Sequence, residues 1–502
     1  MIGCGSSGES EKKSSAEQNA TVYSVSFYDA NLDFNGSTDV TSNAIDIAEL
    51  KTTLDINASA LYAASSDTDV LGETAYSITG DIRLYAEANV TEITDQNGLA
   101  AINADAVTLN GKYILLNDIA LDESGAGFEG ALGWKPIGDE TIHFNGIFNG
   151  DNHKITSLWI DRQAIDCVGL FGYIDVAQIR NIGVEIAEGK AVTGGEFVGA
   201  IAGWSDGLIV NSYSTGNVSG NHAIGGIAGG SGGLIANSYA TGNVSGNSSV
   251  GGIAGSDNGS ITYSYATGNV SAVGSYVGGI AGMAGGFIIN SYATGNVSGD
   301  SDVGGIGGAV AHRIINSYAT GNVSGTFCCV GGIAGILGGD VINSYAEGNV
   351  SGYSLVGGIG GRVRAYALIA NSYATGNVSG DIGVGGIAGN VESHPTLQNN
   401  AAINSQVSGN SHVDRIVGLI EGGDTTVSNN FTLSSMSITA VGAGNNGTSK
   451  TIGDLKTRLT YESAINGDGL GGLGWFFGDD DDHPWKIDAS KNNGLPYLYW
   501  EN

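Results

Sequence analysis

Residues 237–246 read Asn-Ser-Tyr-Ala-Thr-Gly-Asn-Val-Ser-Gly, and the same block recurs with small changes along the chain. Successive copies lie 26 to 28 residues apart. Their tyrosines are Tyr213, Tyr239, Tyr265, Tyr292, Tyr318, Tyr345 and Tyr373. A period of this length that persists over many copies is typical of repeat proteins, in which each unit packs against its neighbours.

A second block, Val-Gly-Gly-Ile-Ala-Gly or a close variant, lies between the tyrosine blocks. Clear copies begin at Val198, Ile224, Val250, Val277, Val303, Val330, Val356 and Val384. Weaker copies begin at Val168 and Val417. Two linked blocks in each repeat over this span predict about ten structural coils.

The length and composition of the repeat favour strands. Helical repeats run to roughly 33–47 residues and need long amphipathic helices, whereas Gly, Asn, Ser and Val interrupt every candidate helix here. The remaining pieces are short strand-like runs between turn residues. Coils stacked at about 4.8 Å would pair each strand with its equivalent in the next coil. The sequence therefore predicts an all-β fold, a right-handed parallel β-helix of about ten 26–28-residue coils.

Stacking in register would place identical side chains on top of one another, with the tyrosines as a structural ladder and Val and Ile in the core. The sequence leaves open which face of each strand points inward. Val250 and Ile253 differ in parity, so both can face inward only if a bend or bulge lies between them. The variable segments between blocks, such as residues 300–302 and 362–364, are expected at loop edges, where binding sites usually lie.

Composition and charge exclude several classes of protein. The 502 residues include 85 Gly and 4 Pro, but they lack the Gly-X-Y period of collagen and keep enough apolar residues for a packed core. Against 19 Lys and Arg stand 50 Asp and Glu, a net charge of −31. A free nucleic-acid-binding protein needs the opposite sign, so no nucleic-acid partner is expected.

The first residues, Met-Ile-Gly-Cys followed by a polar Ser-rich stretch, resemble the end of a bacterial lipoprotein signal and a flexible tether. The resemblance implies lipidation at Cys4. The basic and apolar regions needed for export do not precede Cys4 in this sequence, so the start is expected to lie upstream or to have been trimmed. The alternative is a short tail with an incidental cysteine. The remaining cysteines, Cys167, Cys328 and Cys329, are expected to be packed in the ordinary way.

The two linked blocks resemble the GLUG-motif repeats of bacterial secreted and surface proteins, over roughly residues 168–420. Residues 113–119 and 144–155 resemble the opening segment of such proteins, and residues 494–500 their closing segment. The resemblance implies a β-helical, adhesin-like surface protein and supplies no catalytic residues. Some relatives attach a zinc peptidase, but the sequence has no His-Glu-x-x-His motif, so that activity is not expected.

These observations divide the chain into five parts. They are a lipoprotein-like tether at 1–20, a small β-rich module at 21–92, first coils or a cap at 93–167, the GLUG-repeat β-helix at 168–430 and a C-terminal cap at 431–502. The aromatic-rich end is expected to cover the last coil, because an open solenoid end exposes unpaired strand edges.

An acidic run near the C-terminus is a candidate calcium site, since carboxylate oxygens are calcium ligands. Its members are Asp479, Asp480, Asp481, Asp482 and Asp488. Their spacing matches no EF-hand loop, and a charge run is usually solvated. We therefore expect no cofactor, with calcium as the alternative, and no metal site among the scattered histidines.

The expected function is non-catalytic: a cell-surface or outer-membrane protein held by a lipid anchor, or otherwise extracellular, that adheres to a glycan or a surface protein. A polysaccharide lyase or hydrolase is one alternative, but the acids within the repeats are scattered among variable loops. They are Asp300, Asp302, Asp340, Glu347 and Asp381.

An ice-binding protein is another alternative, because regular Thr and Asn rows recur, although Glu347 interrupts the Thr row and Thr-Gly-Asn is also a natural turn. The Thr row is Thr215, Thr241, Thr267, Thr294, Thr320 and Thr375. The Asn row is Asn217, Asn243, Asn269, Asn296, Asn322 and Asn349.

Overall fold

The computed structural model divides the chain into two compact units, residues 1–90 and 91–502. It describes residues 22–40, 44–54, 56, 60–64, 76–77, 80–439, 447–462, 473 and 475–501. Cys4, the predicted lipidation site, lies outside the described residues.

The N-terminal unit is a small sheet with one helix. Its four-stranded sheet has the order β2-β1-β6-β4. The bounds are β1 (Tyr23–Tyr28), β2 (Phe34–Val40), β3 (Ala44–Ile45), α1 (Ile47–Thr53), β4 (Tyr62–Ala63), β5 (Tyr76–Ser77) and β6 (Ile82–Tyr85). Asp46 begins the helix by accepting hydrogen bonds from the backbone amides of Ala48 and Glu49. Val25, Phe27 and Leu84 belong to a separate hydrophobic core within this N-terminal unit.

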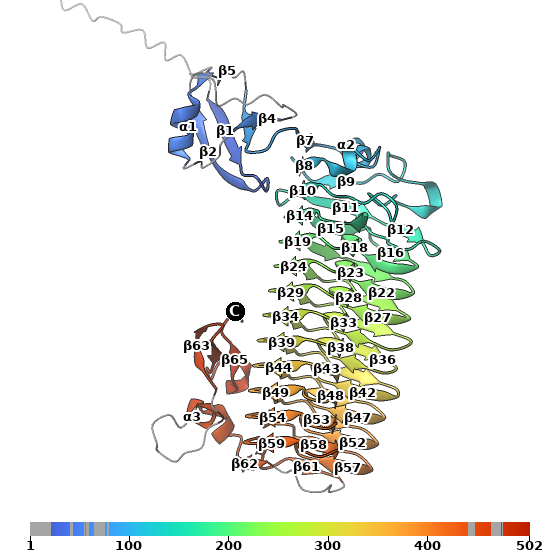
Figure 1. Ribbon diagram of the computed structural model, residues 1–502, viewed down its shortest axis with the longest axis vertical. Coiled ribbons are helices and arrows are strands. Elements are labelled where there is room, and N and C mark those ends of the chain that lie inside the picture. The colour runs from blue at the N-terminus through green and yellow to red at the C-terminus, as the bar shows by residue number, and fades with distance from the viewer. Residues whose placement is uncertain are drawn as a thin grey trace, which may run out of the picture. The chain divides into compact units, whose positions relative to one another are not determined.

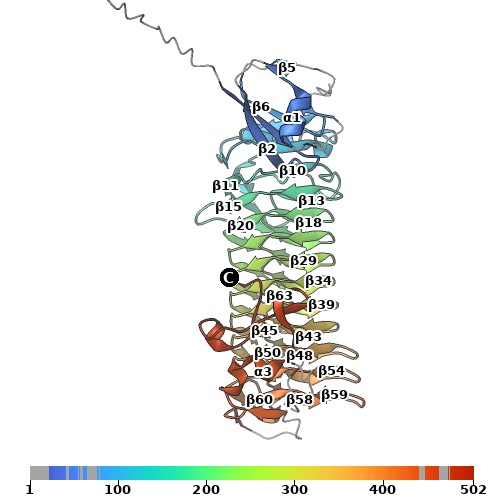
Figure 2. The same cartoon turned by 90° about the vertical axis from the view of Figure 1, so that its left-hand side faces the viewer.

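The second unit is a solenoid of stacked coils, each with short parallel strands on five faces (Figures 1 and 2). One coil contains β19 (Leu208–Val210), β20 (Tyr213–Thr215), β21 (Asn217–Ser219), β22 (His222–Gly225) and β23 (Ala228–Ser231). We number the faces 1 to 5 in that order. The next coil begins at β24 (Leu234–Ala236), which pairs in parallel with β19.

Each face is one continuous parallel sheet. Face 1 has thirteen strands, from β7 (Val90–Ile93) to β59 (Thr426–Ser428), and face 2 has thirteen, from β9 (Ile119–Ala120) to β62 (Thr448–Lys450). Face 3 has eleven, from β12 (Ile160–Arg162) to β61 (Ser437–Ile438). Face 4 has nine, from β17 (Glu196–Gly199) to β57 (Ser411–Asp414), and face 5 has ten, from β13 (Phe171–Ile174) to β58 (Val417–Ile420). The predicted all-β class and the stacked parallel coils are confirmed.

The Asn-Ser-Tyr block forms a corner between faces 1 and 2. Asn237 adopts a positive φ of 49°, a left-handed conformation that Asn tolerates better than most residues. The Ser238 hydroxyl donates to the carbonyl of Ala236 at 2.8 Å and accepts from the amide of Ser212 in the preceding coil at 3.2 Å. The repeated serine of the block therefore provides hydrogen-bond partners for backbone groups at this corner.

The Val-Gly-Gly-Ile block forms a corner between faces 4 and 5 and fills the core. Val250 and Ile253 are both fully buried, and a bend at Gly252 and Ile253 separates β27 (Ser248–Gly251) from β28 (Ala254–Asp257). The bend resolves the parity problem seen in the sequence. A Cβ atom at position 252 would overlap the carbonyl oxygen of Gly279 in the next coil, so the stacking itself requires glycine there.

The first coil of the solenoid is closed by the helix α2 (Gln96–Ala101). The Asp95 side chain begins this helix by accepting from the amide of Gly98. Leu99 and Ile102 are fully buried within the same core cluster as the first coils. The helix therefore covers apolar residues that an open solenoid end would leave in water.

The C-terminal end runs along the side of the solenoid, which corrects our expectation that it covers the last coil. After η3 (Asp454–Lys456) and α3 (Arg458–Tyr461), β63 (Phe477–Asp480), β64 (His483–Lys486) and β65 (Tyr497–Leu498) form a small antiparallel sheet. We call residues 475–501 the strap. Trp500 stacks on Tyr318 at a ring-centroid distance of 5.5 Å, and the Trp475 indole donates to the carbonyl of Asn399 at 2.7 Å. The stacked tyrosines offer this aromatic segment an apolar strip along the rod (Figures 1 and 2).

Candidate ligand-binding groove

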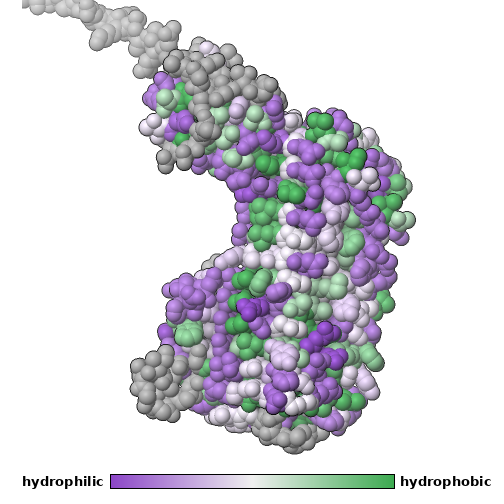
Figure 3. Space-filling view, in the orientation of Figure 1, coloured by the Kyte–Doolittle hydropathy of each residue, from purple (hydrophilic) through white to green (hydrophobic). Residues whose placement is uncertain are grey.

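The outward row of face 5 changes in side-chain size along the rod. Strand register places one residue of each coil in this row. The row runs Trp204, Gly230, Ser256, Met283, Ala309, Ile336 and Arg362. Gly230, Ser256 and Ala309 are smaller than the other residues of the row, so the row is uneven along the rod axis, on a face where hydrophobic and hydrophilic residues lie side by side (Figure 3).

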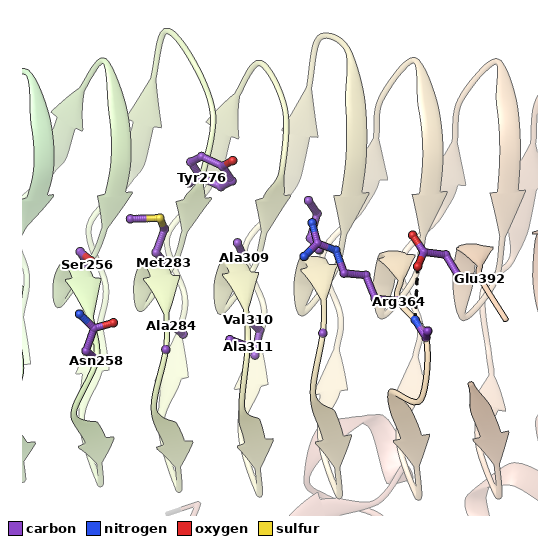
Figure 4. Close-up of a pocket in the computed structure, with 14 residues that line it drawn as sticks. Ser256, Asn258, Tyr276, Met283, Ala284, Ala309, Val310, Ala311, Arg364 and Glu392 are labelled. Atoms are coloured by element: carbon purple, nitrogen blue, oxygen red, sulfur yellow. Dashed lines mark hydrogen bonds between the residues drawn. The ribbon is translucent and has the colours of Figure 1, made fainter. Parts of the chain in front are cut away.

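Along this row lies a groove of about 680 Å³ that crosses several coils (Figure 4). Met283, Ala309 and Ile336 contribute apolar surface to it. Ser256 and Asn258 lie toward one end, and Arg364 and Glu392 toward the other. The volume lies within the roughly 300–1,000 Å³ of small-molecule pockets, and the mixture of apolar lining and a few polar groups is typical of them.

Tyr276 is the aromatic residue of the groove, and it directly precedes a Val-Gly-Gly block. It has a positive φ of 64°, as does its equivalent Phe197 at 54°. The Phe197 ring contacts Trp204, in the outward row of its own coil, edge-on at 5.0 Å. This backbone conformation therefore directs the side chain toward face 5, and Tyr276 lines the groove together with Met283 of the same coil.

The polar end of the groove is held by a network around Glu392. Arg362 forms an ion pair with Glu392 Oε1 at 2.6 Å, and Glu392 Oε2 accepts from the amide of Ala365 at 3.3 Å. Asp302, equivalent in its coil to Tyr276, is half-buried, and burial raises its pKa while Arg364 and Arg362 oppose that rise. These contacts position the backbone that carries Arg364.

The seven tyrosines stack with ring-centroid distances of 4.8–5.0 Å and ring planes within 7° of one another. The strap covers the C-terminal part of this ladder. The Tyr373 hydroxyl donates to the carbonyl of Pro496 at 2.6 Å, and the Tyr345 hydroxyl donates to Glu501 at 2.7 Å. The aromatic row is therefore an internal docking surface over these coils.

Two departures from the repeat coincide with strap contacts. Tyr263 replaces the corner Asn, and its hydroxyl lies 3.4 Å from an oxygen of Asp481, which also accepts from Asn290 at 3.1 Å. Glu347 replaces Thr in its row and lies close enough to Glu501 to influence its charge. Burial, with a contribution from Glu347, raises the pKa of Glu501 to about 7, and burial also raises the pKa of Glu347.

The Thr and Asn rows lie at the turn between faces 2 and 3. The amide of each Asn from Asn243 onward donates to the side-chain oxygen of its equivalent one coil earlier, as at Asn269 to Asn243 with 3.0 Å. Thr241, Thr267 and Thr294 are exposed. An exposed Ser row on face 3, in register from coil to coil, lies next to them. Several coils therefore present a regular array of hydroxyl and amide groups.

The acidic run of the strap is engaged in local contacts. Asp479 pairs with Lys486 at 2.6 Å, and Asp480 with His483 at 2.8 Å. Asp481 docks the strap, and Asp488 accepts from the amide of Ser490 at 2.8 Å. Within the described ranges, no group of three or more His, Cys, Asp or Glu could hold a metal ion. Calcium binding by these residues and Asp482 stays the untested alternative to the expected absence of a cofactor.

The cysteines differ in their surroundings. Cys328 and Cys329 form a disulfide between adjacent residues, so our expectation of ordinary packing for this pair is wrong. Disulfides between adjacent cysteines are strained and uncommon, which is why the sequence favours packed thiols at this corner. Cys167 is a buried free thiol, and burial raises its pKa.

Sequence reasoning missed the groove, although a signal for it was present. Ser256, Met283, Ala309 and Ile336 occupy one fixed position three residues after the Ile of each block. The glycine before that position repeats in each of these coils, whereas the position itself varies in both size and polarity. Such variation at one register position of a repeating coil favours an outward row. The segment with Arg362 and Arg364 was assigned to a loop edge, but not to a groove.

A family model described as the GLUG motif matches residues 352–379. The chain therefore carries the GLUG motif. The matched residues make one coil, from β47 (Ser354–Gly357) to β51 (Val378–Ser379), and the GLUG coil repeats along the solenoid. The predicted GLUG resemblance is confirmed.

The chain is similar to parts of two larger relatives. It shares 36% identity with halomucin of Haloquadratum walsbyi over 133 residues, which are 26% of this chain and 1% of the relative. It shares 36% identity with a candidate Gly-rich membrane protein of Evansella cellulosilytica over 87 residues, 16% of this chain and 10% of the relative. The chain therefore matches a small part of the length of these curated relatives.

A solved structure of a candidate immunoglobulin A1 protease from Bacteroides ovatus is also similar to this chain. The identity is 18% and the TM-score 0.25, over 82% of this chain and 93% of that chain. In the part of the chain that the structure describes, no helix is long and apolar enough to cross a membrane.

Proposed function

We propose that this GLUG-motif protein is a non-catalytic surface protein that adheres to an extracellular glycan through the groove on face 5. The observation that carries the proposal is the groove itself, about 680 Å³, with an aromatic ring, an apolar floor and hydrogen-bonding groups along the rod axis. Sugar rings present apolar faces and hydroxyl edges, which such a lining matches. An extended glycan chain suits a groove that crosses several coils.

The chemistry around the groove supports binding over catalysis. Both oxygens of Glu392 already accept hydrogen bonds, from Arg362 and from the amide of Ala365. Glycoside hydrolysis typically uses two carboxylates placed on either side of the scissile bond. Release of products from polysaccharides by the purified protein would favour the polysaccharide lyase or hydrolase alternative instead.

We further propose that Cys4 carries the lipid that holds the protein at the outer membrane or cell surface. The Cys4 context and the name of the Evansella relative, which describes a membrane protein, support this location. Metabolic labelling with a fatty-acid analogue in the native host should label the protein, and a Cys4→Ser variant should lose the label. Surface display without any label would contradict the lipid anchor but not the glycan site.

The groove is tested by filling it. Ala309→Trp should place a large ring in the outward row of face 5 and reduce binding on a glycan array at least tenfold. Ser298→Trp, on the exposed row of face 3, is the matched control and should bind as the parent does. Equal binding by both variants would show that the groove is not the adhesion site.

One observation favours a second candidate, recognition of ice. The exposed Thr, Asn and Ser rows repeat at the coil spacing and carry no charge apart from Glu347 in the Thr row. A regular, uncharged array of hydroxyl groups suits an ordered hydroxyl lattice. Thermal hysteresis that is lost in Thr267→Lys, without loss of the fold, would select this candidate over the glycan groove.

A further inference from the structure

The groove contains a basic side chain that its surroundings leave without an ion pair. The protein has 19 Lys and Arg and a net charge of −31. Arg362 is neutralised by Glu392 at 2.6 Å. Arg364, two residues further on, lines the same groove and forms no ion pair with any residue that the structure describes. A cation in this position of an acidic protein is available to an anion from outside.

The path of the Arg364 side chain is set by its neighbours. It extends from its own coil toward the preceding one (Figure 4). There it crosses Gly338, where a Cβ atom would stand 4.0 Å from Arg364 Cδ. The amide of Ala365 is held by Glu392 at 3.3 Å, which fixes the backbone beside Arg364. Its guanidinium is therefore presented to the groove from a positioned backbone.

The other charged groups of this region are not available to bind an external anion, whereas Arg364 is. Glu392 is occupied by Arg362 and Ala365. Asp302 is half-buried and feels both arginines, but it lies beyond the 4.0 Å of an ion pair with Arg364. A guanidinium binds a carboxylate or sulfate through two parallel hydrogen bonds, and such charge-assisted bonds are the strong ones.

We propose that the groove selects an acidic glycan, with Arg364 binding a carboxylate or sulfate on one sugar while Tyr276 and Met283 contact the faces of sugars further along the chain. This inference rests on the proposed glycan site and adds the chemical class of the ligand. It predicts recognition by one charged contact within a mostly uncharged groove.

The experiment uses the full chain and three probes. An oligogalacturonate, its fully methyl-esterified form and a sulfated oligosaccharide of similar length separate the charge from the sugar chain and distinguish carboxylate from sulfate. Arg364→Gln should weaken binding of the acid form about tenfold, the range of one charged hydrogen-bonded contact, and should leave the ester unchanged. Arg313→Gln is the matched control, because Arg313 is exposed, lies on face 1 and is paired with Asp340 at 2.8 Å.

The outcomes separate the two proposals. If Ala309→Trp abolishes binding of all probes and Arg364→Gln weakens only the acidic ones, both proposals stand. If Ala309→Trp abolishes binding but Arg364→Gln has no effect, or weakens acid and ester equally, the glycan site stands and the acidic specificity is overturned. If Ala309→Trp leaves glycan binding intact, the site itself is wrong. Circular dichroism checks that each variant keeps its sheets.

Discussion

Position 252 illustrates how stacking decides residue identity in this protein. Gly252 has no unusual φ, yet a side chain there would overlap the carbonyl oxygen of Gly279 in the next coil. The requirement therefore comes from the neighbouring repeat, and it recurs at Gly226 against Gly252 and at Gly279 against Gly305. The glycine content follows from this close approach of coils.

We expect Gly252→Ala to lower the free energy of unfolding by about 1–3 kcal/mol, the range for forcing extra atoms into a packed interior. The measurement is urea denaturation followed by circular dichroism. Gly423→Ala is the control, because a Cβ atom there meets nothing within 4 Å. Equal stability of the two variants would mean that the coils can separate slightly at no cost.

Asp257 gives the solenoid a pH dependence at the scale of one residue. It is fully buried on the inward row of face 5, where the two preceding coils have Ser205 and Ser231. Burial raises its pKa to about 7 from an ordinary value of 3.8. The folded state therefore binds a proton that the unfolded state has lost between these values, and this contribution to stability falls as the pH rises toward 7.

Asp257→Ser should make the unfolding free energy less dependent on pH between about 4 and 7, by up to about 1.4 kcal/mol per pH unit, and should stabilise the protein at pH 8. Thermal unfolding at several pH values measures this. A variant with the same pH profile as the parent would assign the dependence to other groups, such as Glu501.

At the scale of elements, the strap is the part of the fold that sequence reasoning placed wrongly. The repeating strands were predictable because each coil copies the pattern of the last, so one block fixes the register of all. The strap has no repeated pattern from which its position could be predicted. Its contacts are distant in sequence, as in the hydrogen bond from Asn290 to Asp481, which are 191 residues apart. Which strand face points outward was also left open, and without it Met283 and Ala309 could not be joined into a groove.

The strap should be held more firmly in mild acid than in mild alkali. Burial next to Glu347 raises the pKa of Glu501 to about 7 from 4.5, so the docked strap is favoured while Glu501 is protonated. The stabilisation is complete below about pH 4.5 and is lost as the pH passes 7. Hydrogen exchange at residues 475–501 should therefore quicken from pH 5 to pH 8 after correction for intrinsic rates, and Glu501→Gln should remove most of the change.

At the scale of the whole solenoid, stability is distributed among interfaces between nearly identical coils. Such a rod should tolerate the loss of one coil, since each repeat depends mainly on its neighbours. Removing residues 213–238 would join Ser212 to Tyr239 and keep every block in register. The sheets of faces 1 to 5 should then re-form with one strand fewer in each.

The strap adds a constraint that the repeats lack, because it contacts the rod at several levels, among them Tyr263 through Asp481 and Tyr345 through Glu501. The separation of Asp481 and Glu501 on the strap therefore requires a fixed number of coils between Tyr263 and Tyr345. Deleting residues 292–317 should leave the rod folded but put one anchor about 4.8 Å out of place, and proteolysis should then release the strap. The deletion of residues 213–238 lies outside the segment from Tyr263 to Tyr345, so the strap should stay protected from proteolysis. Tandem repeats gain and lose copies easily during replication. In this protein a change in the number of middle coils would release the strap, whereas the same change elsewhere in the solenoid would leave the strap docked.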